Sequence, residues 1–536
     1  MRHVSRWILL CTMAAAPAAA ADFSGVFKGY DPEGPGCAVG VARQGQPATF
    51  TAYGLADLEH AVPISAETVM EAGSIAKQFT AASILMLAEE GKLALTDDIR
   101  KYLPEMPDYG TPITINHLLS HTNGLRDWGG VSVIAGWPRS YVVRTNDEVY
   151  EITTRQRALN YKPGDAYSYN NTGFNLAAFI VERVSGKSLP EFTRERIFAP
   201  LGMSKTSWRD DFRRIVPDRA IAYREKTAEG YHQEMPFEDN YGHGGLLTTV
   251  RDMLTWNDAL TNRKFGEFVT KHLEEQAVLN DGRKIGYARG LQHGNYNGVP
   301  EISHGGGTAA YRAWLARYPT KGVSVAVLCN GETSNAAKVA RDAIGVVDPV
   351  VLGAPAAPPK PSAVTAAELS QLPGLYIDER TGRSARVVAA GGGLKFAEGT
   401  REVDLVRLAA RRYRNGGAEM TFKDTGVESR TADGEVTAFR KVDAYTPSAP
   451  ELAALAGRYT SAEADGVLQV SVKEGRLVLA PVNRPSAAAA LTPLSRDVFK
   501  DADGLITIVR GSGGKVEGIR FIHPRVYSLV FTRAAG

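Results

Sequence analysis

The C-terminal part of the 536-residue chain contains a sequence repeat, and this repeat restricts the folds open to the chain more than any other feature. Each copy consists of short alternating strands separated by glycine and aspartate turns, a pattern typical of an antiparallel barrel or sandwich. We therefore predict two antiparallel β-barrel domains, at residues 366–447 and 448–536. Two motifs occur in both copies: Glu368-Leu-x-x-Leu-x-Gly-x-Tyr376 recurs as Glu451-Leu-x-x-Leu-x-Gly-x-Tyr459, and Gly434-x-Val-x-x-Phe-Arg440 recurs as Gly514-x-Val-x-x-Ile-Arg520.

A proline-rich linker at residues 346–365 precedes the repeat. Because a chain of this length is too long for one hydrophobic core, we predict a further domain at residues 22–345. Residues 1–21 have the pattern of a secretory signal peptide, with Arg2 and Arg6 before an apolar run and an alanine-rich end. We predict cleavage near Ala21 and export to the periplasm or the exterior.

Charge and hydropathy narrow the partners that the chain can bind. The apolar run of the signal is short for a bilayer span, and no later stretch approaches that length, so we expect no stable membrane insertion. The net charge is +3, and it falls to +1 without Arg2 and Arg6, so we expect no nucleic acid partner. Cys37 and Cys329 lie in apolar, strand-like runs. We predict buried free thiols there, with a single disulfide as the alternative.

The segment 70–79 has the features of a helix start that carries a nucleophile. Ser74 and Lys77 are three residues apart, which places their side chains on one helix face. Apolar residues at helical spacing follow, so the helix should be buried, and burial lowers the pKa of a lysine toward that of a proton acceptor. Alone, Ser-x-x-Lys is a weak signal, since about one or two occur by chance in a chain of this length.

Two later segments add polar groups of the same chemistry. Tyr169 and Asn171 lie in a loop before a helix predicted over 175–184, and their spacing points both side chains the same way. A phenol beside a lysine can move protons for a serine, and an amide can hold a carbonyl. His304 is followed by three glycines, Gly305, Gly306 and Gly307, as at a strand edge where the backbone must come close to another group.

Together and in this order, Ser74-x-x-Lys77, Tyr169-x-Asn171 and His304-Gly-Gly resemble the serine β-lactamase and penicillin-binding protein family, especially its class C branch with the related esterases and D-aminopeptidases. The resemblance covers about residues 30–340. It implies an α/β (α+β) catalytic domain with an antiparallel sheet and a helical subdomain. A catalytic domain followed by two lipocalin-like barrels is similar to the D-aminopeptidases.

The resemblance also implies roles for the motif residues in an exported serine hydrolase that works through an acyl-enzyme. Ser74 would attack the substrate, Lys77 and Tyr169 would share the proton transfers, and Asn171 would orient the substrate. The backbone N–H groups of Ser74 and Gly307 would form the oxyanion hole. The remaining predicted site residues are His304 as a catalytic residue, and Gly305, Gly306 and Arg312 as substrate-binding residues.

The third motif departs from the lactamases and DD-carboxypeptidases, in which a lysine stands where this chain has His304. A neutral imidazole supplies no fixed charge for a substrate carboxylate, which puts efficient action on β-lactams and DD-peptides in doubt. Amides or short peptides with an N-terminal D-residue are the first prediction, given also Arg312. A carboxylesterase and a weak β-lactamase are the alternatives, and a non-catalytic binding protein is the competing class.

Glu238 and Asp239 are candidates to bind the substrate ammonium group, although a solvated loop explains them more simply.

We expect a small-molecule or short-peptide substrate, no cofactor and no metal, and homo-oligomer formation stays open. His117 and His121 are four residues apart, but no acid lies between them and no third ligand is evident, so a packed helix end is the better interpretation. The resemblance to the D-aminopeptidases also implies that a loop of the last barrel reaches the active site and narrows it. The candidate turns are 500–504 and 511–514.

Overall fold

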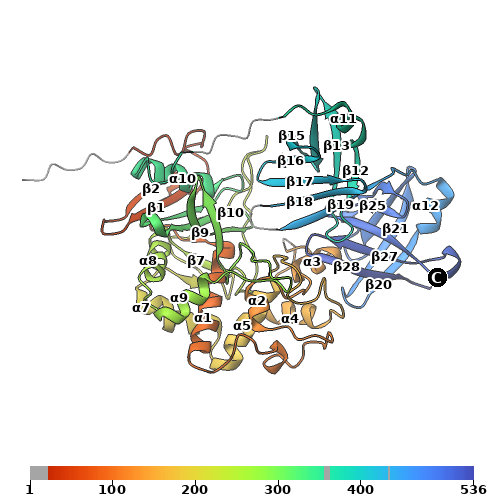
Figure 1. Ribbon diagram of the computed structural model, residues 1–536. Coiled ribbons are helices and arrows are strands. Elements are labelled where there is room, and N and C mark those ends of the chain that lie inside the picture. Colours follow the sequence, from red (N-terminus) through yellow and green to blue (C-terminus); the bar gives the residue numbers. More distant parts are fainter. Residues whose placement is uncertain (1–21, 140, 355–361, 432–434, 536) are drawn as a thin grey trace, which may run out of the picture.

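The computed structural model describes residues 22–139, 141–354, 362–431 and 435–535. The predicted signal peptide therefore lies outside the described residues, as do the middle of the linker and Gly434. Figure 1 shows the catalytic domain on one side of the molecule and the two C-terminal domains on the other. No helix among the described residues has the length and apolar character needed to cross a membrane.

The N-terminal domain is built on a six-stranded sheet in which β1, from the start of the domain, pairs with β11, from its end. Every ladder in the sheet is antiparallel. The order is β2 (Thr49–Tyr53), β1 (Cys37–Arg43), β11 (Val323–Cys329), β10 (Tyr311–Tyr318), β9 (Val299–Thr308) and β8 (Gln292–Tyr296).

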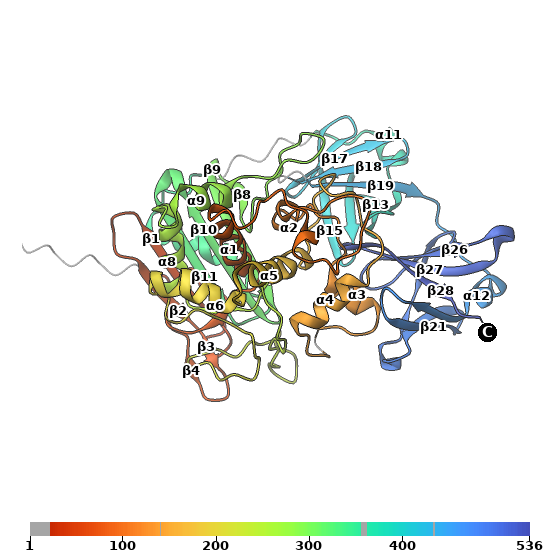
Figure 2. The ribbon, with the colours of Figure 1, turned by 90° about the horizontal axis from the view of Figure 1, so that it is seen from below.

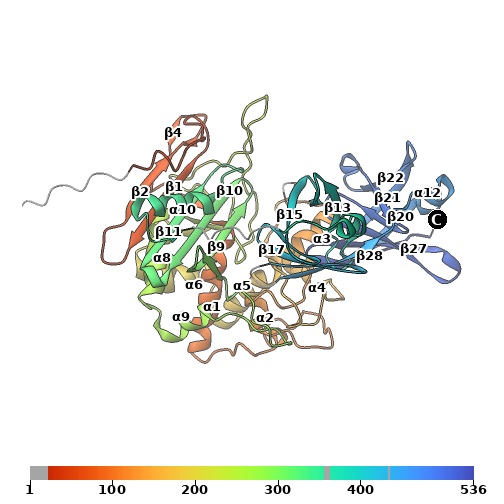
Figure 3. The same ribbon diagram turned by 45° about the horizontal axis from the view of Figure 1, so that its top comes forward.

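Helices cover both faces of this sheet, so its central strands are apolar on both sides. Cys37, Val39 and Val41 of β1 pack with α10 (Ala336–Val347), while Ala38 faces the helical layer that contains α1 (Lys77–Glu89) and α8 (Val250–Thr261). Figure 3 shows α10 lying across the sheet. Helix α1 is buried over most of its length, and it therefore forms the centre of the helical layer.

The other helices of the domain are short, with the exception of α5. Their bounds are α2 (Ile115–Leu119), α3 (Trp128–Ile134), α4 (Asn146–Thr154), α5 (Thr172–Ser185), α6 (Leu189–Thr193), α7 (Ala199–Leu201) and α9 (Gly266–Glu274). Two small antiparallel sheets complete the domain, one of β3 (Leu55–Asp57) and β4 (Val62–Pro63), the other of β5 (Met70–Glu71), β7 (Leu246–Thr248) and β6 (Ser207–Trp208).

The structure corrects the prediction for the cysteines. Cys37 of β1 lies directly opposite Cys329 of β11, with their Cα atoms 4.0 Å apart, and the two are joined by a disulfide. Free thiols were the favoured expectation, and they are wrong because the pairing depends on strand register. Only the fold brings these two distant strands side by side.

The first repeat copy is a closed eight-stranded antiparallel barrel. Helix α11 (Ala366–Gln371) precedes it, capped by Thr365 and Glu368. The strands are β12 (Gly374–Ile377), β13 (Ser384–Ala390), β14 (Gly393–Glu398), β15 (Arg401–Ala409), β16 (Arg412–Asn415), β17 (Ala418–Lys423), β18 (Gly426–Arg430) and β19 (Val436–Val442).

The second copy is a nine-stranded antiparallel sheet that curls into a nearly closed barrel, with β23 and β24 as its end strands. Helix α12 (Ala449–Leu455) precedes it, with a capping box of Ser448 and Glu451. The strands are β20 (Gly457–Ser461), β21 (Gly466–Lys473), β22 (Arg476–Pro481), β23 (Ala489–Ala490), β24 (Thr492–Ser495), β25 (Val498–Lys500), β26 (Leu505–Arg510), β27 (Val516–His523) and β28 (Val526–Arg533). The predicted fold class is confirmed.

The second barrel packs directly on the catalytic domain. Trp128 and Val131 of α3 share an apolar cluster with Leu529 and Phe531 of β28, and Figures 1 and 2 both place α3 beside this barrel. The approach is close at Gly130, where a Cβ atom would lie 2.8 Å from the Val526 side chain. The first barrel shares a separate apolar cluster with the second.

Candidate active site

Ser74 lies on a short 3-10 turn, Gly73–Ala76, that leads into α1. The sequence predicted it on the first helical turn, and the structure places it one turn earlier, with Lys77 as the first residue of the α-helix. Gly73 has a φ of +53°, and a Cβ atom there would lie 2.6 Å from the backbone N of Gly307. Glycine is therefore required for the turn to approach β9.

Lys77 is fully buried, and its ammonium nitrogen has three polar partners. Nζ lies 3.1 Å from Ser74 Oγ, 3.0 Å from Asn171 Oδ1 and 2.6 Å from the carbonyl oxygen of His243. Burial lowers the pKa of Lys77 well below its usual value, and the charge of Arg525 lowers it further. A neutral amine would keep two N–H bonds to Asn171 and His243 and direct its lone pair at Ser74. Lys77 is therefore placed to accept the serine proton.

Tyr169 and Asn171 approach the same point from the loop before α5. Asn171 is the N-cap residue of α5, and its N–H donates to Asp127 Oδ2 at 2.7 Å. The Tyr169 ring centroid is 4.8 Å from Lys77 Nζ. Burial raises the pKa of Tyr169, while a hydrogen bond with Ser74 opposes that rise. Tyr169 therefore keeps its proton at neutral pH, whereas Lys77 tends to lose one.

The glycines after His304 form a free strand edge beside the nucleophile. The ladder between β8 and β9 ends at Ser303, so the residues that follow have no β8 partner on that side within the part of the chain that the structure describes. A Cβ atom on Gly306 would lie 2.0 Å from the carbonyl oxygen of Ala72. The predicted close approach is thus observed, and the group approached is the turn that carries Ser74.

His304 is buried and neutral. Burial, with the nearby Lys77 charge, lowers its pKa to about 4. Nδ1 donates to the Gly305 carbonyl at 2.6 Å, so Nε2, 3.1 Å from the Tyr287 hydroxyl, accepts from that group. The ring centroids of His304 and Tyr169 are 6.2 Å apart. The imidazole therefore binds Tyr287 and lies near the Tyr169 ring, and its predicted catalytic role stays a prediction.

His121 belongs to the same aromatic group. Its ring centroid is 4.1 Å from that of Tyr169 and 4.6 Å from that of Tyr287. Nδ1 accepts from the Asn170 N–H, and Nε2 has no hydrogen-bond partner among the described residues. Burial lowers the pKa of His121 well below its usual value. Neutral aromatic rings therefore surround Tyr169 and keep the site apolar.

Arg312 stands opposite Gly307 in the ladder between β10 and β9. Its Nη1 donates to the carbonyls of Ala309 and Tyr311 at 2.9 and 2.8 Å, and Nη2 lies 3.9 Å from Glu332. Arg312 thus lies beside Gly307, and its role in substrate binding stays a prediction.

Glu238 and Asp239, the candidates for an ammonium site, are engaged within the protein. Glu238 is buried and forms an ion pair with Arg139, and one Asp239 oxygen accepts from the Phe212 N–H at 2.7 Å. The solvated-loop alternative is wrong for Glu238, because the Arg139 guanidinium compensates its buried charge. The Glu238 carboxylate is therefore not left free for a substrate.

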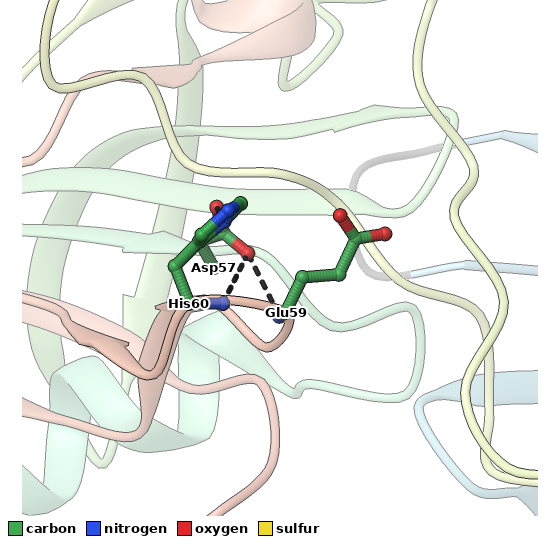
Figure 4. A group of neighbouring side chains, drawn as sticks. All are labelled: Asp57, Glu59 and His60. Atoms are coloured by element: carbon green, nitrogen blue, oxygen red, sulfur yellow. Dashed lines mark hydrogen bonds and ion pairs between the residues drawn. The ribbon is translucent and has the colours of Figure 1, made fainter.

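The pair of histidines considered as a metal site does not form one. His117 accepts the Thr114 N–H at its Nδ1 as part of a helix cap, and His121 is buried in the aromatic group. Among the described residues, one group of three side chains has ligand atoms close enough for a cation: Asp57, Glu59 and His60. In that turn Asp57 already accepts the N–H groups of Glu59 and His60 (Figure 4).

The structure also brings in residues that the sequence did not indicate. Asp127 caps α3 and holds the loop of Asn171, Tyr287 binds His304, and the carbonyl of His243 binds Lys77. The Asp-Trp-Gly-Gly sequence after Arg126 is a recognisable N-cap signal for Asp127. No local pattern distinguishes Tyr287 or His243.

The last barrel reaches the site through a different turn from those predicted. The turns at 500–504 and 511–514 make their hydrogen bonds within the barrel, for example from His523 to Asp501 and from Arg510 to Gly514. The turn between β27 and β28 instead places the Arg525 guanidinium carbon 5.1 Å from the Tyr169 ring centroid. The predicted turns are wrong because reach depends on how the barrel packs.

Comparison with known proteins gives one family match and a set of similar proteins. A family model described as Beta-lactamase matches residues 24–347. A D-aminopeptidase of Cereibacter sphaeroides is 28% identical over 512 residues, covering 91% of this chain and 93% of that protein. A D-aminopeptidase of Gluconobacter oxydans is 28% identical over 439 residues, covering 81% and 80%. Among solved structures, the octameric penicillin-binding protein homologue from Pyrococcus abyssi has a TM-score of 0.54 at 23% identity, covering 76% of this chain and 96% of that one.

The family match extends over more than half of the chain. The chain therefore belongs to the beta-lactamase family, and it is a serine hydrolase of that family.

Proposed function

We propose that the chain hydrolyses amides and short peptides with an N-terminal D-residue through an acyl-enzyme on Ser74. The observation that carries the proposal is the buried contact of 3.1 Å between Lys77 Nζ and Ser74 Oγ, completed by Asn171 and the His243 carbonyl. The substrate class is supported by relatives named D-aminopeptidase that match the chain over almost its whole length.

In the proposed mechanism, neutral Lys77 accepts the Ser74 proton as Oγ attacks the carbonyl carbon. The N–H groups of Ser74 and Gly307 bind the resulting oxyanion. Tyr169, protonated because of its burial, donates to the leaving nitrogen as the C–N bond breaks, and regains a proton from Lys77. Water then attacks the ester carbonyl and gives its proton to Lys77, which returns a proton to Ser74 Oγ as the C–O bond breaks and the carboxylic acid is released.

The alternatives differ in what the site must bind. A lactamase of this family needs a fixed cation for the substrate carboxylate at the third motif, and His304 is neutral there. A carboxylesterase needs no charged group beyond the oxyanion hole, so it stays the second candidate. A non-catalytic binding protein does not require the lowered pKa of Lys77, which supports the enzymatic alternative.

A comparison of rates on four substrates tests the proposal. D-alanine p-nitroanilide, its L isomer, p-nitrophenyl butyrate and nitrocefin should be assayed side by side with the wild type and with Ser74→Ala. The proposal predicts a higher kcat/KM for the D anilide than for the L anilide. It also predicts little hydrolysis of nitrocefin. Preference for the ester without D over L selectivity would support the carboxylesterase instead.

Export is part of the proposal. The sequence of residues 1–21 supports it, and so does the disulfide between Cys37 and Cys329, because such bonds persist in oxidising compartments. Intact mass of the protein from the native host should correspond to a chain that begins near Asp22. A chain retaining residues 1–21 would contradict export by this signal.

A further inference from the structure

The turn that carries Arg525 is fixed to the catalytic domain by its backbone. The Arg525 carbonyl oxygen accepts from the Asp127 N–H at 3.1 Å and from Asn160 Nδ2 at 3.0 Å. Asn160 Oδ1 in turn accepts the Tyr527 N–H at 2.9 Å. Because hydrogen bonds to Asp127 and Asn160 fix the backbone at Arg525 and at Tyr527, the Arg525 side chain projects from a fixed point of the backbone.

The guanidinium of Arg525 lies over the Tyr169 ring and is exposed. No acidic side chain of the described residues forms an ion pair with it. Asp127 donates its backbone N–H to the Arg525 carbonyl, but its carboxylate oxygens already accept the N–H groups of Gly129, Gly130 and Asn171. Arg525 therefore presents an exposed positive charge, without an ion-pair partner among the described residues, over the Tyr169 ring.

We infer that Arg525 binds a carboxylate on the leaving-group side of the substrate. This inference rests on the proposed function, and it deepens it: the substrate class becomes short peptides in which a D-residue is followed by a residue with a free carboxylate. Tyr169 donates to the leaving nitrogen, so a group stacked on the Tyr169 ring faces the part of the substrate beyond that nitrogen. The planar guanidinium matches a carboxylate with two parallel hydrogen bonds.

The position of this charge also accounts for the substitution in the third motif. His304 is neutral and its ring nitrogens are engaged by Gly305 and Tyr287. A fixed cation is thus missing from β9 and is supplied instead by the last barrel. The two positions are on different elements, so a substrate must place its carboxylate differently from one that binds a lysine on β9.

The test compares two dipeptides that differ only in charge, D-alanyl-glycine and D-alanyl-glycinamide. The wild type should prefer the carboxylate form by at least about fivefold in kcat/KM, as a charge-assisted hydrogen bond allows. At a pH above the rising limb of the kcat/KM profile, Arg525→Met should abolish that preference and leave the amide form within about twofold, while Arg525→Lys should keep part of it. Arg476→Met removes another exposed arginine of the same barrel and should leave kcat/KM unchanged for both dipeptides.

Absence of a preference in the wild type, or an equal loss on both dipeptides in Arg525→Met, would overturn the inference. Unchanged circular dichroism and unfolding temperature would show that the variants are folded. The butyryl esters of 4-hydroxybenzoate and 4-hydroxybenzamide separate this inference from the proposed function, because they carry the same charge difference on an ester leaving group. If the dipeptides are inert but the esters show a preference that depends on Arg525, the carboxylate site stands and the D-peptide proposal fails.

Discussion

The two C-terminal barrels share their local structure and differ by one strand. In both, a tyrosine hydroxyl donates to the carbonyl four residues earlier at 2.7 Å: Tyr376 to Leu372 and Tyr459 to Leu455. In the first barrel, β19 pairs directly with β12. In the second, β28 lies between β27 and β20, the strands that carry the corresponding repeat motifs.

The added strand is the part of the second barrel that matters for the site. Sequence alignment of the copies matches Phe422-Lys-Asp with Phe499-Lys-Asp and Arg440 with Arg520, which leaves β28 without a counterpart. The turn before β28 contains Arg525, and β28 itself packs on α3. The repeated strands therefore form the scaffold of both barrels, whereas the contact with Tyr169 comes from β28 and the turn before it, which only the second copy has.

Matched core truncations should separate the two barrels most strongly. Leu529→Ala in β28 and Leu394→Ala in β14 each remove a fully buried side chain, at a cost of about 2–5 kcal/mol in the free energy of unfolding of that barrel. Only Leu529→Ala should lower kcat/KM on D-alanyl-glycine, by about tenfold, because only β28 supports the Arg525 turn. Chemical denaturation and steady-state kinetics measure both effects. Equal losses of activity would show that the barrels do not differ in this respect.

A smaller effect is expected from loosening the turn without disturbing the barrel. Asn160→Ala removes the hydrogen bonds to the backbone of Arg525 and Tyr527, each worth about 1 kcal/mol. We expect a loss of about three- to tenfold in kcat/KM on the carboxylate dipeptide. Asn483→Ala is the control, since Asn483 also bridges the second barrel to the catalytic domain, at Ala135, but away from Arg525. A similar loss in the control would point to domain docking in general.

The pH profile should shift modestly when the charge of Arg525 is removed. Neutral Lys77 is the active form, so kcat/KM rises as pH increases through the pKa of Lys77, which burial and Arg525 lower. Arg525→Met should raise that pKa and move the rising limb to higher pH by about 0.3–1 unit, screened by salt. Arg380→Met in the first barrel, whose side chain lies over Tyr527, should leave the limb in place. A shift to lower pH would contradict the assignment of Lys77 as the base.

The smallest effects should come from the features that both copies share. Tyr376→Phe and Tyr459→Phe each remove one buried hydrogen bond to a carbonyl, for about 1 kcal/mol of unfolding free energy. Both variants should retain kcat/KM within about twofold. Thermal unfolding would show the two losses to be of similar size, and a large activity loss in either variant would mean that the scaffold also controls the site.

The parts of the fold that local patterns determine could be predicted from the sequence. The helix predicted over 175–184 is the larger part of α5. The close approach at Gly306 was predicted because only glycine tolerates it. Ser74 and Lys77 were predicted neighbours, since helical spacing alone brings them together.

Contacts between distant segments could not be predicted in the same way. The disulfide of Cys37 depends on the register of β1 against β11, which the sequence does not encode locally. In the sequence Arg525 has no feature that distinguishes it from other turn residues. Its position over Tyr169 depends on the packing of the second barrel on α3. Tyr287 carries no motif, and its role depends on the tautomer that Gly305 imposes on His304.

In the proposed mechanism Ser74, activated by Lys77, forms the acyl-enzyme. Its most direct test is the intact mass of the wild type and of Ser74→Ala after reaction with a fluorophosphonate, followed by peptide mapping. We expect one covalent adduct on the peptide containing Ser74 in the wild type and none in the variant. An adduct of equal yield in Ser74→Ala, or one mapped to another serine in the wild type, would contradict it.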